Sequence, residues 1–130
     1  MKNYYQQKKG GWCLEPVIYA KTVKQIRCYR FFQQMIRDYA AAGPEERSKM
    51  DLQDVMIAEA YVNAIDQGLQ SYVPAEYREA VFAHLVDGEE YIDLEDRFFV
   101  SASTMKRYVQ VFVWGVAKEL GENFQTGIGA

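Results

Sequence analysis

The sequence predicts an all-α fold, and three observations support this prediction. Apolar residues recur at intervals of three and four in several long segments, the spacing that places side chains on one face of an α-helix. Proline or glycine stands at the borders of these segments, as at Pro16, Gly43, Pro74 and Gly121. No stretch alternates apolar and polar residues over a useful length, so nothing indicates a β-strand. A chain of 130 residues, 49% of them hydrophobic, is the size of one compact domain.

The N-terminal half is expected to form two helices. Residues 16–43 read as one long helix, because Ile26, Tyr29, Phe32, Ile36 and Tyr39 follow each other at helical spacing. A polar turn over residues 43–49 separates it from a second helix over residues 50–73. The second helix has its own apolar stripe, formed by Leu52, Val55, Val62, Ile65 and Leu69.

Three shorter elements are expected in the C-terminal half. Pro74 suits the first position of a helix over residues 74–88, where its missing N–H group is not needed. A short helix covers residues 91–99, and a last helix begins at Ser101 and ends near Leu120, ahead of Gly121. Trp114, on the polar side of this last helix, is expected to be covered by the N-terminal helices.

The last helix has two distinct faces. Its apolar stripe, expected to be core, consists of Met105, Val109, Phe112 and Val116. Its opposite face consists of Ser103, Lys106, Arg107 and Gln110. These four side chains donate hydrogen bonds from the first three turns, the part of a recognition helix that meets base edges and phosphates. The amides at the helix N-terminus would add to phosphate attraction. The alternative is an ordinary solvated helix face.

Charge is unevenly distributed along the chain. Residues 1–43 hold eight basic and two acidic side chains, whereas residues 44–100 hold four basic and fourteen acidic ones. Residues 101–130 are close to neutral, with three basic and two acidic side chains. A net charge of −3 therefore conceals a strongly basic N-terminal segment and a slightly basic C-terminal one, either of which could contact a polyanion. It also conceals an acidic middle that would repel DNA or face a basic protein.

Residues 73–121 resemble the C-terminal half of phage and prophage late-gene transcription regulators of the ArpU and RinA kind. The resemblance is carried by the pattern S-x-S-T-x-x-R, followed by an apolar helix that ends in AKELG at residues 117–121. In those regulators the helix-turn-helix is similar to region 4 of sigma factors. The resemblance implies double-stranded DNA as partner and leaves RNA polymerase open as a second one. It implies that Ser101 caps the recognition helix and that Ser103, Thr104, Lys106, Arg107 and Gln110 face DNA.

Two positions depart from this family pattern. Glu95 stands where the first helix of the motif usually has a small residue, and Phe99 stands where its turn often has glycine. A tight turn that requires a positive φ would strain Phe99, which favours a longer or differently shaped turn. The acidic run over residues 87–96 would also reduce affinity for phosphates.

Composition and motifs argue against an enzyme, a metal site or a cofactor. There is no glycine-rich phosphate loop, and His84 has no second histidine or cysteine at ligand spacing. Cys13 and Cys28, in a chain without an export signal, are expected to be reduced thiols. No apolar run is long enough to span a membrane and no signal peptide is recognisable, so a cytoplasmic protein is expected.

The expected organisation is a single domain over residues 1–130, in which two N-terminal helices pack on a C-terminal sigma-region-4-like helix-turn-helix. Its parts are a basic segment at 1–15, a helical pair at 16–72, the helix-turn-helix region at 73–121 and a flexible tail at 122–130. The function expected is that of a phage or prophage transcription regulator. Two alternatives stay open, a small terminase subunit for DNA packaging and a helix-turn-helix that has come to bind protein. A homo-oligomer is open in each case.

Overall fold

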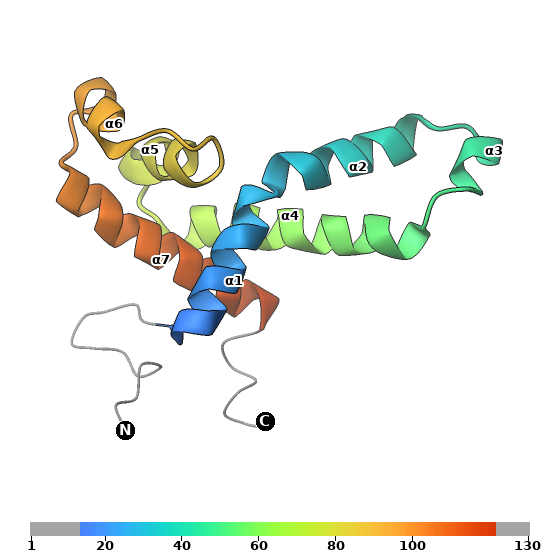
Figure 1. Ribbon diagram of the computed structural model, residues 1–130, viewed down its shortest axis with the longest axis horizontal. Helices are drawn as coiled ribbons and strands as arrows, with labels where there is room; N and C mark the ends of the chain where they lie inside the picture. The colour runs from blue at the N-terminus through green and yellow to red at the C-terminus, as the bar shows by residue number, and fades with distance from the viewer. Residues whose placement is uncertain (1–13, 122–130) are drawn as a thin grey trace.

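The computed structural model describes residues 14–121, which form seven α-helices and no strand (Figure 1). The all-α prediction is therefore confirmed for this range. The predicted flexible tail and most of the basic N-terminal segment lie outside it. The helices are α1 (Pro16–Arg27), α2 (Tyr29–Ala41), α3 (Pro44–Arg47), α4 (Leu52–Tyr72), α5 (Ala75–Leu85), α6 (Tyr91–Phe98) and α7 (Ala102–Leu120).

The last helix, α7, is the centre of the fold. It packs against α1, α4, α5 and α6, and α4 covers the longest part of it. Each of the seven residues from 111 to 117 is buried, because α7 is surrounded on several sides at this level. The predicted core stripe is confirmed, since the buried side chains include Met105, Val109, Phe112 and Val116.

The close contact between α4 and α7 depends on two glycines. A Cβ atom at Gly68 would lie 2.6 Å from Val116 Cγ2 and 2.9 Å from the Val116 backbone nitrogen. A Cβ atom at Gly115 would overlap the ring of Tyr72. Without these side chains the two helices approach closely enough for Tyr72 to pack edge-on against Trp114, with ring centroids 5.6 Å apart. Trp114 is thus buried against an N-terminal helix, as expected.

The prediction of one long first helix was wrong, because the chain bends at Cys28. This residue has φ −88° and ψ 7°, and its N–H group donates to the carbonyl of Gln25 at 3.1 Å instead of continuing the α-helical pattern. The two resulting helices have different neighbours: α1 packs mainly on α7, whereas α2 packs on α4. The N-terminal half therefore contains four helices, counting the short α3, and not the expected two.

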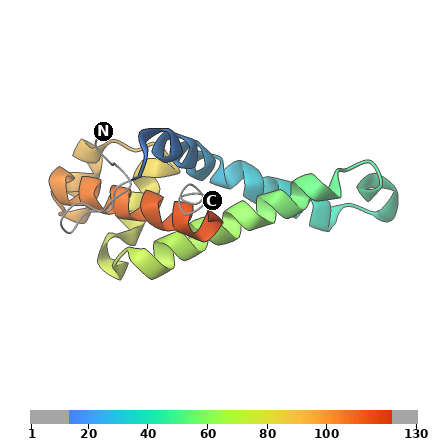
Figure 2. The same cartoon turned by 90° about the horizontal axis from the view of Figure 1, so that it is seen from below.

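The helices α2, α3 and the first half of α4, residues 29–62, form an arm that extends away from the remaining helices, the body (Figures 1 and 2). Its tip, expected to be a turn, contains α3. Arg47 closes the tip by donating to the carbonyls of Tyr39 and Ala40 at 2.9 and 3.0 Å, which satisfies backbone acceptors at the end of α2.

Within residues 14–121, no helix has the length and apolar character needed to cross a lipid bilayer.

The other element borders agree closely with the predictions. The helix α5 begins one residue later than expected, because Pro74 has a ψ of 144° and lies just outside it. It ends at Leu85, ahead of a turn in which Gly88 has a φ of +72°. The short helix α6 and the last helix α7 occupy the predicted segments.

Candidate nucleic-acid interface

Three residues, Phe99, Val100 and Ser101, connect α6 to α7. The expectation that this turn would be longer or differently shaped, to spare Phe99 a positive φ, was wrong: Phe99 itself adopts the left-handed conformation, with φ 56° and ψ 41°. Its N–H group donates to the Glu95 carbonyl at 2.9 Å, which ends α6. The side chain is 91% exposed, so no packing contact holds it there. A left-handed residue with a Cβ atom costs about 1–2 kcal/mol.

Ser101 caps α7 as predicted. Its backbone is extended and its Oγ atom accepts a hydrogen bond from the Thr104 N–H group at 3.2 Å. The same hydroxyl donates to Thr104 Oγ1 at 3.0 Å. Thr104 is half-buried, and its hydroxyl is held by the cap. Of the six predicted site residues, these two form the start of the helix.

Glu95 ties the end of α6 to the start of α7. Its Oε2 atom accepts a hydrogen bond from the Ala102 N–H group at 2.6 Å, where its charge complements the positive end of the α7 dipole. Two of the first amides of α7, those of Ala102 and Thr104, are therefore already occupied. The expectation that this helix N-terminus attracts phosphate needs correction, because a carboxylate of the chain itself occupies it.

The other four predicted residues, Ser103, Lys106, Arg107 and Gln110, are all exposed. Two of them are cations, and within residues 14–121 neither forms an ion pair with a carboxylate. The Lys106 ammonium lies 5.4 Å from the centre of the Tyr91 ring, and the Arg107 guanidinium lies 5.9 Å from that of Tyr108. Such contacts orient a cation without neutralising it.

Stacked side chains support these two rings. Tyr108 stacks on Tyr77 of α5 with centroids 4.5 Å apart, and Tyr91 stacks on His84 with centroids 3.9 Å apart. His84 is further held by its Nδ1 atom, which lies 2.8 Å from the Glu89 carbonyl oxygen. Burial raises the pKa of the Tyr91 hydroxyl, and a hydrogen bond with Glu76 raises that of Tyr77. These pairs escaped prediction because one partner in each stack lies on α5.

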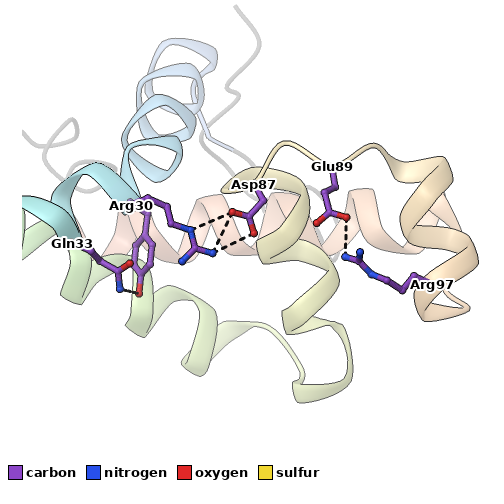
Figure 3. Close-up of polar contacts among 6 residues, drawn as sticks. Arg30, Gln33, Asp87, Glu89 and Arg97 are labelled. Atoms are coloured by element: carbon purple, nitrogen blue, oxygen red, sulfur yellow. Dashed lines mark hydrogen bonds and ion pairs between the residues drawn. The ribbon is translucent and has the colours of Figure 1, made fainter.

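The acidic run at residues 87–96 is partly neutralised inside the molecule (Figure 3). Asp87 forms an ion pair with Arg30 of α2 at 3.2 Å, and Glu89 forms one with Arg97 of α6 at 2.9 Å. Glu95 accepts the hydrogen bond from the Ala102 N–H group at the start of α7, as described above. The acids left exposed without an ion pair among the described residues are Glu90, Asp93 and Asp96.

An apolar surface adjoins these acids on α6. Ile92, Asp96 and Phe99 follow each other at intervals of four and three, the spacing of one helix face. Ile92 is 66% exposed and Phe99 is 91% exposed. We call Ile92, Asp93, Asp96 and Phe99 the α6 surface. It differs from the polar face of α7 in both charge and polarity.

Within residues 14–121, no three histidine, cysteine, aspartate or glutamate side chains gather closely enough to hold a metal ion. Cys28 is an exposed free thiol, and Cys13 lies outside the described residues. The candidate site is therefore the polar face of α7, framed by the turn at Phe99 and by the acids of α6.

Compared with protein-family models, with curated proteins and with solved structures, the chain gives no match.

Proposed function

We propose that this chain is a DNA-binding transcription regulator of phage or prophage origin, in which α6 and α7 form a sigma-like helix-turn-helix. The observation that carries the proposal is the row of exposed donors on the first three turns of α7, in which neither cation forms an ion pair within residues 14–121. A helix entering the major groove presents this part of its surface to base edges and phosphates.

The proposed roles follow from the side-chain chemistry. Lys106 and Arg107 would contact guanine edges or phosphates, since both are cations on the exposed face. Ser103 and Gln110 would add polar contacts to bases or sugar-phosphate oxygens. Ser101 and Thr104, which are hydrogen-bonded to each other, would fix the residue at which α7 begins. They would therefore set the position of the exposed donors in the major groove.

Fluorescence anisotropy with duplex DNA from a late promoter region tests the proposal. The wild type should bind with an affinity that falls steeply with salt, because each phosphate contact releases counterions. Arg107→Ala and Lys106→Ala should each weaken binding and lower the salt slope by about 0.9 per lost contact. Lys49→Ala, which removes an exposed cation at the tip of the arm, is the matched control and should change neither. Binding that shows no salt dependence and survives Arg107→Ala contradicts the proposal.

A second function is favoured by the α6 surface. Phe99 is strained and almost fully exposed. Its neighbours in the α6 surface are Ile92 and two acids, Asp93 and Asp96, that form no ion pair among the described residues. An exposed aromatic side chain in such a setting is typical of an anchor for a basic protein partner. RNA polymerase is the partner to test first, by biolayer interferometry in the absence of DNA. Phe99→Ala and the double variant Asp93→Asn, Asp96→Asn should each weaken this binding, whereas Arg107→Ala should leave it unchanged. The opposite pattern favours DNA recognition alone.

A further inference from the structure

One side of α4 in the arm is exposed and carries no charge. Counting 100° per residue, its residues occupy a sector of about 140°, wider than the stripe with which a helix normally packs on a core. The charged residues of α4, Asp54, Glu59 and Asp66, all lie outside this sector. We call this surface the outer α4 face; it consists of Leu52, Gln53, Met56, Ile57, Ala60, Asn63 and Gln67.

The outer α4 face is unusually apolar for a surface left in water. Leu52, Met56 and Ile57 are 52%, 58% and 44% exposed. Leu52 and Met56 lie one turn apart, and the exposed Ala60 lies about one turn from both Met56 and Ile57, so these side chains belong to one patch. The apolar patch ends toward the body in the amides of Asn63 and Gln67, which can form hydrogen bonds at the rim of an interface.

The arm that carries this face lacks a core of its own. Within the arm the buried side chains are Tyr29 at its base, Val55 and Ala58, whereas seven consecutive residues of α7 are buried in the body. The arm is a two-helix layer closed by α3. At its base Tyr29 and Arg30 contact Phe82 of α5 and Tyr61 accepts a hydrogen bond from Gln25 of α1. Toward its tip no third element of the described chain lies against it (Figures 1 and 2). The buried Val55 and Ala58 lie on the opposite side of α4 from the outer α4 face, so packing on α2 leaves that face uncovered.

We propose that the outer α4 face binds the same face of a second copy of this chain. In a twofold dimer each surface meets its own copy, so a charged surface would repel itself. The outer α4 face avoids this repulsion because its charged neighbours stand only at its edges. A basic or an acidic partner, by contrast, would find no opposite charge on it. This inference is independent of the proposed DNA binding.

Ala60 lies near the middle of the outer α4 face, both along the helix and around it. A twofold axis that crosses α4 near Ala60 would pair the two α4 helices in antiparallel orientation, with their smallest side chain at the point of closest approach. Seven residues per copy are fewer than the roughly 20–30 of a standard interface, so the dimer should be weak and dissociate in the micromolar range.

Sedimentation equilibrium of the full chain between roughly 1 and 200 µM tests the dimer, over the range expected for a small interface. The wild type should approach twice its chain mass of 15.1 kDa as concentration rises. Ala60→Glu and Ala60→Lys should each remain monomeric, because they bring like charges together at the axis. Both are strong helix formers at an exposed position, and circular dichroism should show unchanged helix content. The matched control is Ala20→Glu at an exposed alanine of α1, which should dimerise like the wild type.

Mixing the two charged variants gives the sharpest test. An equimolar mixture of Ala60→Glu and Ala60→Lys should regain dimer mass, because unlike charges then meet at the axis. A mixture that stays monomeric overturns the proposed contact, as does a wild type that stays monomeric at 200 µM or an oligomer that survives Ala60→Glu. A closed ring of more than two copies also overturns it and favours the terminase alternative.

Discussion

Among the described residues other than glycine, Phe99 is the one with a positive φ, and its side chain is almost fully exposed. Its conformation follows from its position. The chain must leave α6 and start α7 within three residues, and the left-handed geometry allows the Phe99 N–H group to end α6 at the Glu95 carbonyl. The strained backbone of Phe99 therefore lowers the stability of the fold, and it allows the short turn between α6 and α7.

We predict that Phe99→Gly stabilises the protein by about 0.5–1 kcal/mol, because glycine has no Cβ atom to oppose the left-handed backbone and loses only part of that gain as chain entropy. Chemical denaturation measures the change. Phe99→Ala is the control, since it removes the ring but keeps the Cβ atom and should leave stability nearly unchanged. If alanine stabilises as much as glycine does, exposure of the ring is the cause and backbone strain is not.

Tyr29 gives a prediction for alkaline pH. Its hydroxyl donates to Asp66 Oδ1 at 2.7 Å, and burial together with this hydrogen bond raises the pKa of Tyr29 to about 12 from its ordinary value of 10.0. The neutral form is favoured in the folded state, so its contribution is complete below pH 10 and is lost as pH rises toward 12.

The measurement is the free energy of unfolding of the wild type and of Tyr29→Phe between pH 9 and pH 12. The variant lacks the hydroxyl and should be less stable at pH 9, and the difference between the two proteins should shrink above pH 10. A difference that stays constant over this range would show that the hydroxyl does not titrate as expected.

At the scale of elements, the start of α7 depends on two side chains that act on different amides. Ser101 satisfies the Thr104 N–H group and Glu95 satisfies that of Ala102. Ser101 is the residue directly before α7, whereas Glu95 belongs to α6 and contacts the start of α7 from there. Glu95 thus links the two helices of the candidate motif and also places a negative charge beside the surface proposed for DNA.

Ser101→Ala should lower the free energy of unfolding by about 1 kcal/mol, the usual cost of losing a helix cap. Thermal denaturation followed by circular dichroism checks this value. Ser103→Ala is the matched control, because Ser103 is exposed in the first turn of the same helix and its loss should have almost no effect on stability. Equal losses in both variants would mean that the hydroxyl of Ser101 is not the cap.

Glu95→Gln should strengthen DNA binding several-fold while lowering stability slightly. The amide oxygen can still accept from Ala102, but the negative charge that opposes phosphate at the α7 terminus is gone. Anisotropy titrations at two salt concentrations measure the effect. Asp38→Asn, which neutralises an exposed acid in the arm, is the control for net charge. Equal gains in both variants would assign the effect to net charge alone.

At the scale of the whole molecule, a well-packed body is joined to an arm with few buried side chains. The body is held by the contact of α4 with α7, and that contact tolerates no side chain at Gly68. The arm has no comparable constraint. Substitutions of the same kind should therefore have very different effects in the two parts.

Gly68→Ala should lower the free energy of unfolding by about 1–3 kcal/mol, because the new methyl group meets the backbone of Val116, which cannot move aside as a flexible side chain could. Gly43→Ala in the arm is the matched control, since a Cβ atom there has nothing within 4 Å and the φ of −78° suits alanine. Denaturation curves of the two variants measure the change in the free energy of unfolding that each substitution causes. A neutral Gly68→Ala would mean that α4 and α7 are less closely packed than described.

Much of the secondary structure and part of the candidate site could be predicted from the sequence. The core stripe from Met105 to Val116, the cap at Ser101 and the exposure of Lys106 and Arg107 depend on residues within one or two turns, so spacing alone predicts them. The charge asymmetry that places acids beside the polar face of α7 is likewise evident in the sequence.

The amino-acid sequence alone is enough to predict the helical fold class, the borders of the last two helices and the polarity of the two faces of α7. Four features emerge only when the helices pack together: the bend at Cys28, the left-handed Phe99, the hydrogen bond from Ala102 to Glu95 and the burial of α7 on every side from residue 111 to 117. All four have the same cause. Local periodicity places side chains on a face, whereas bends, strain and burial depend on which distant elements pack against that face.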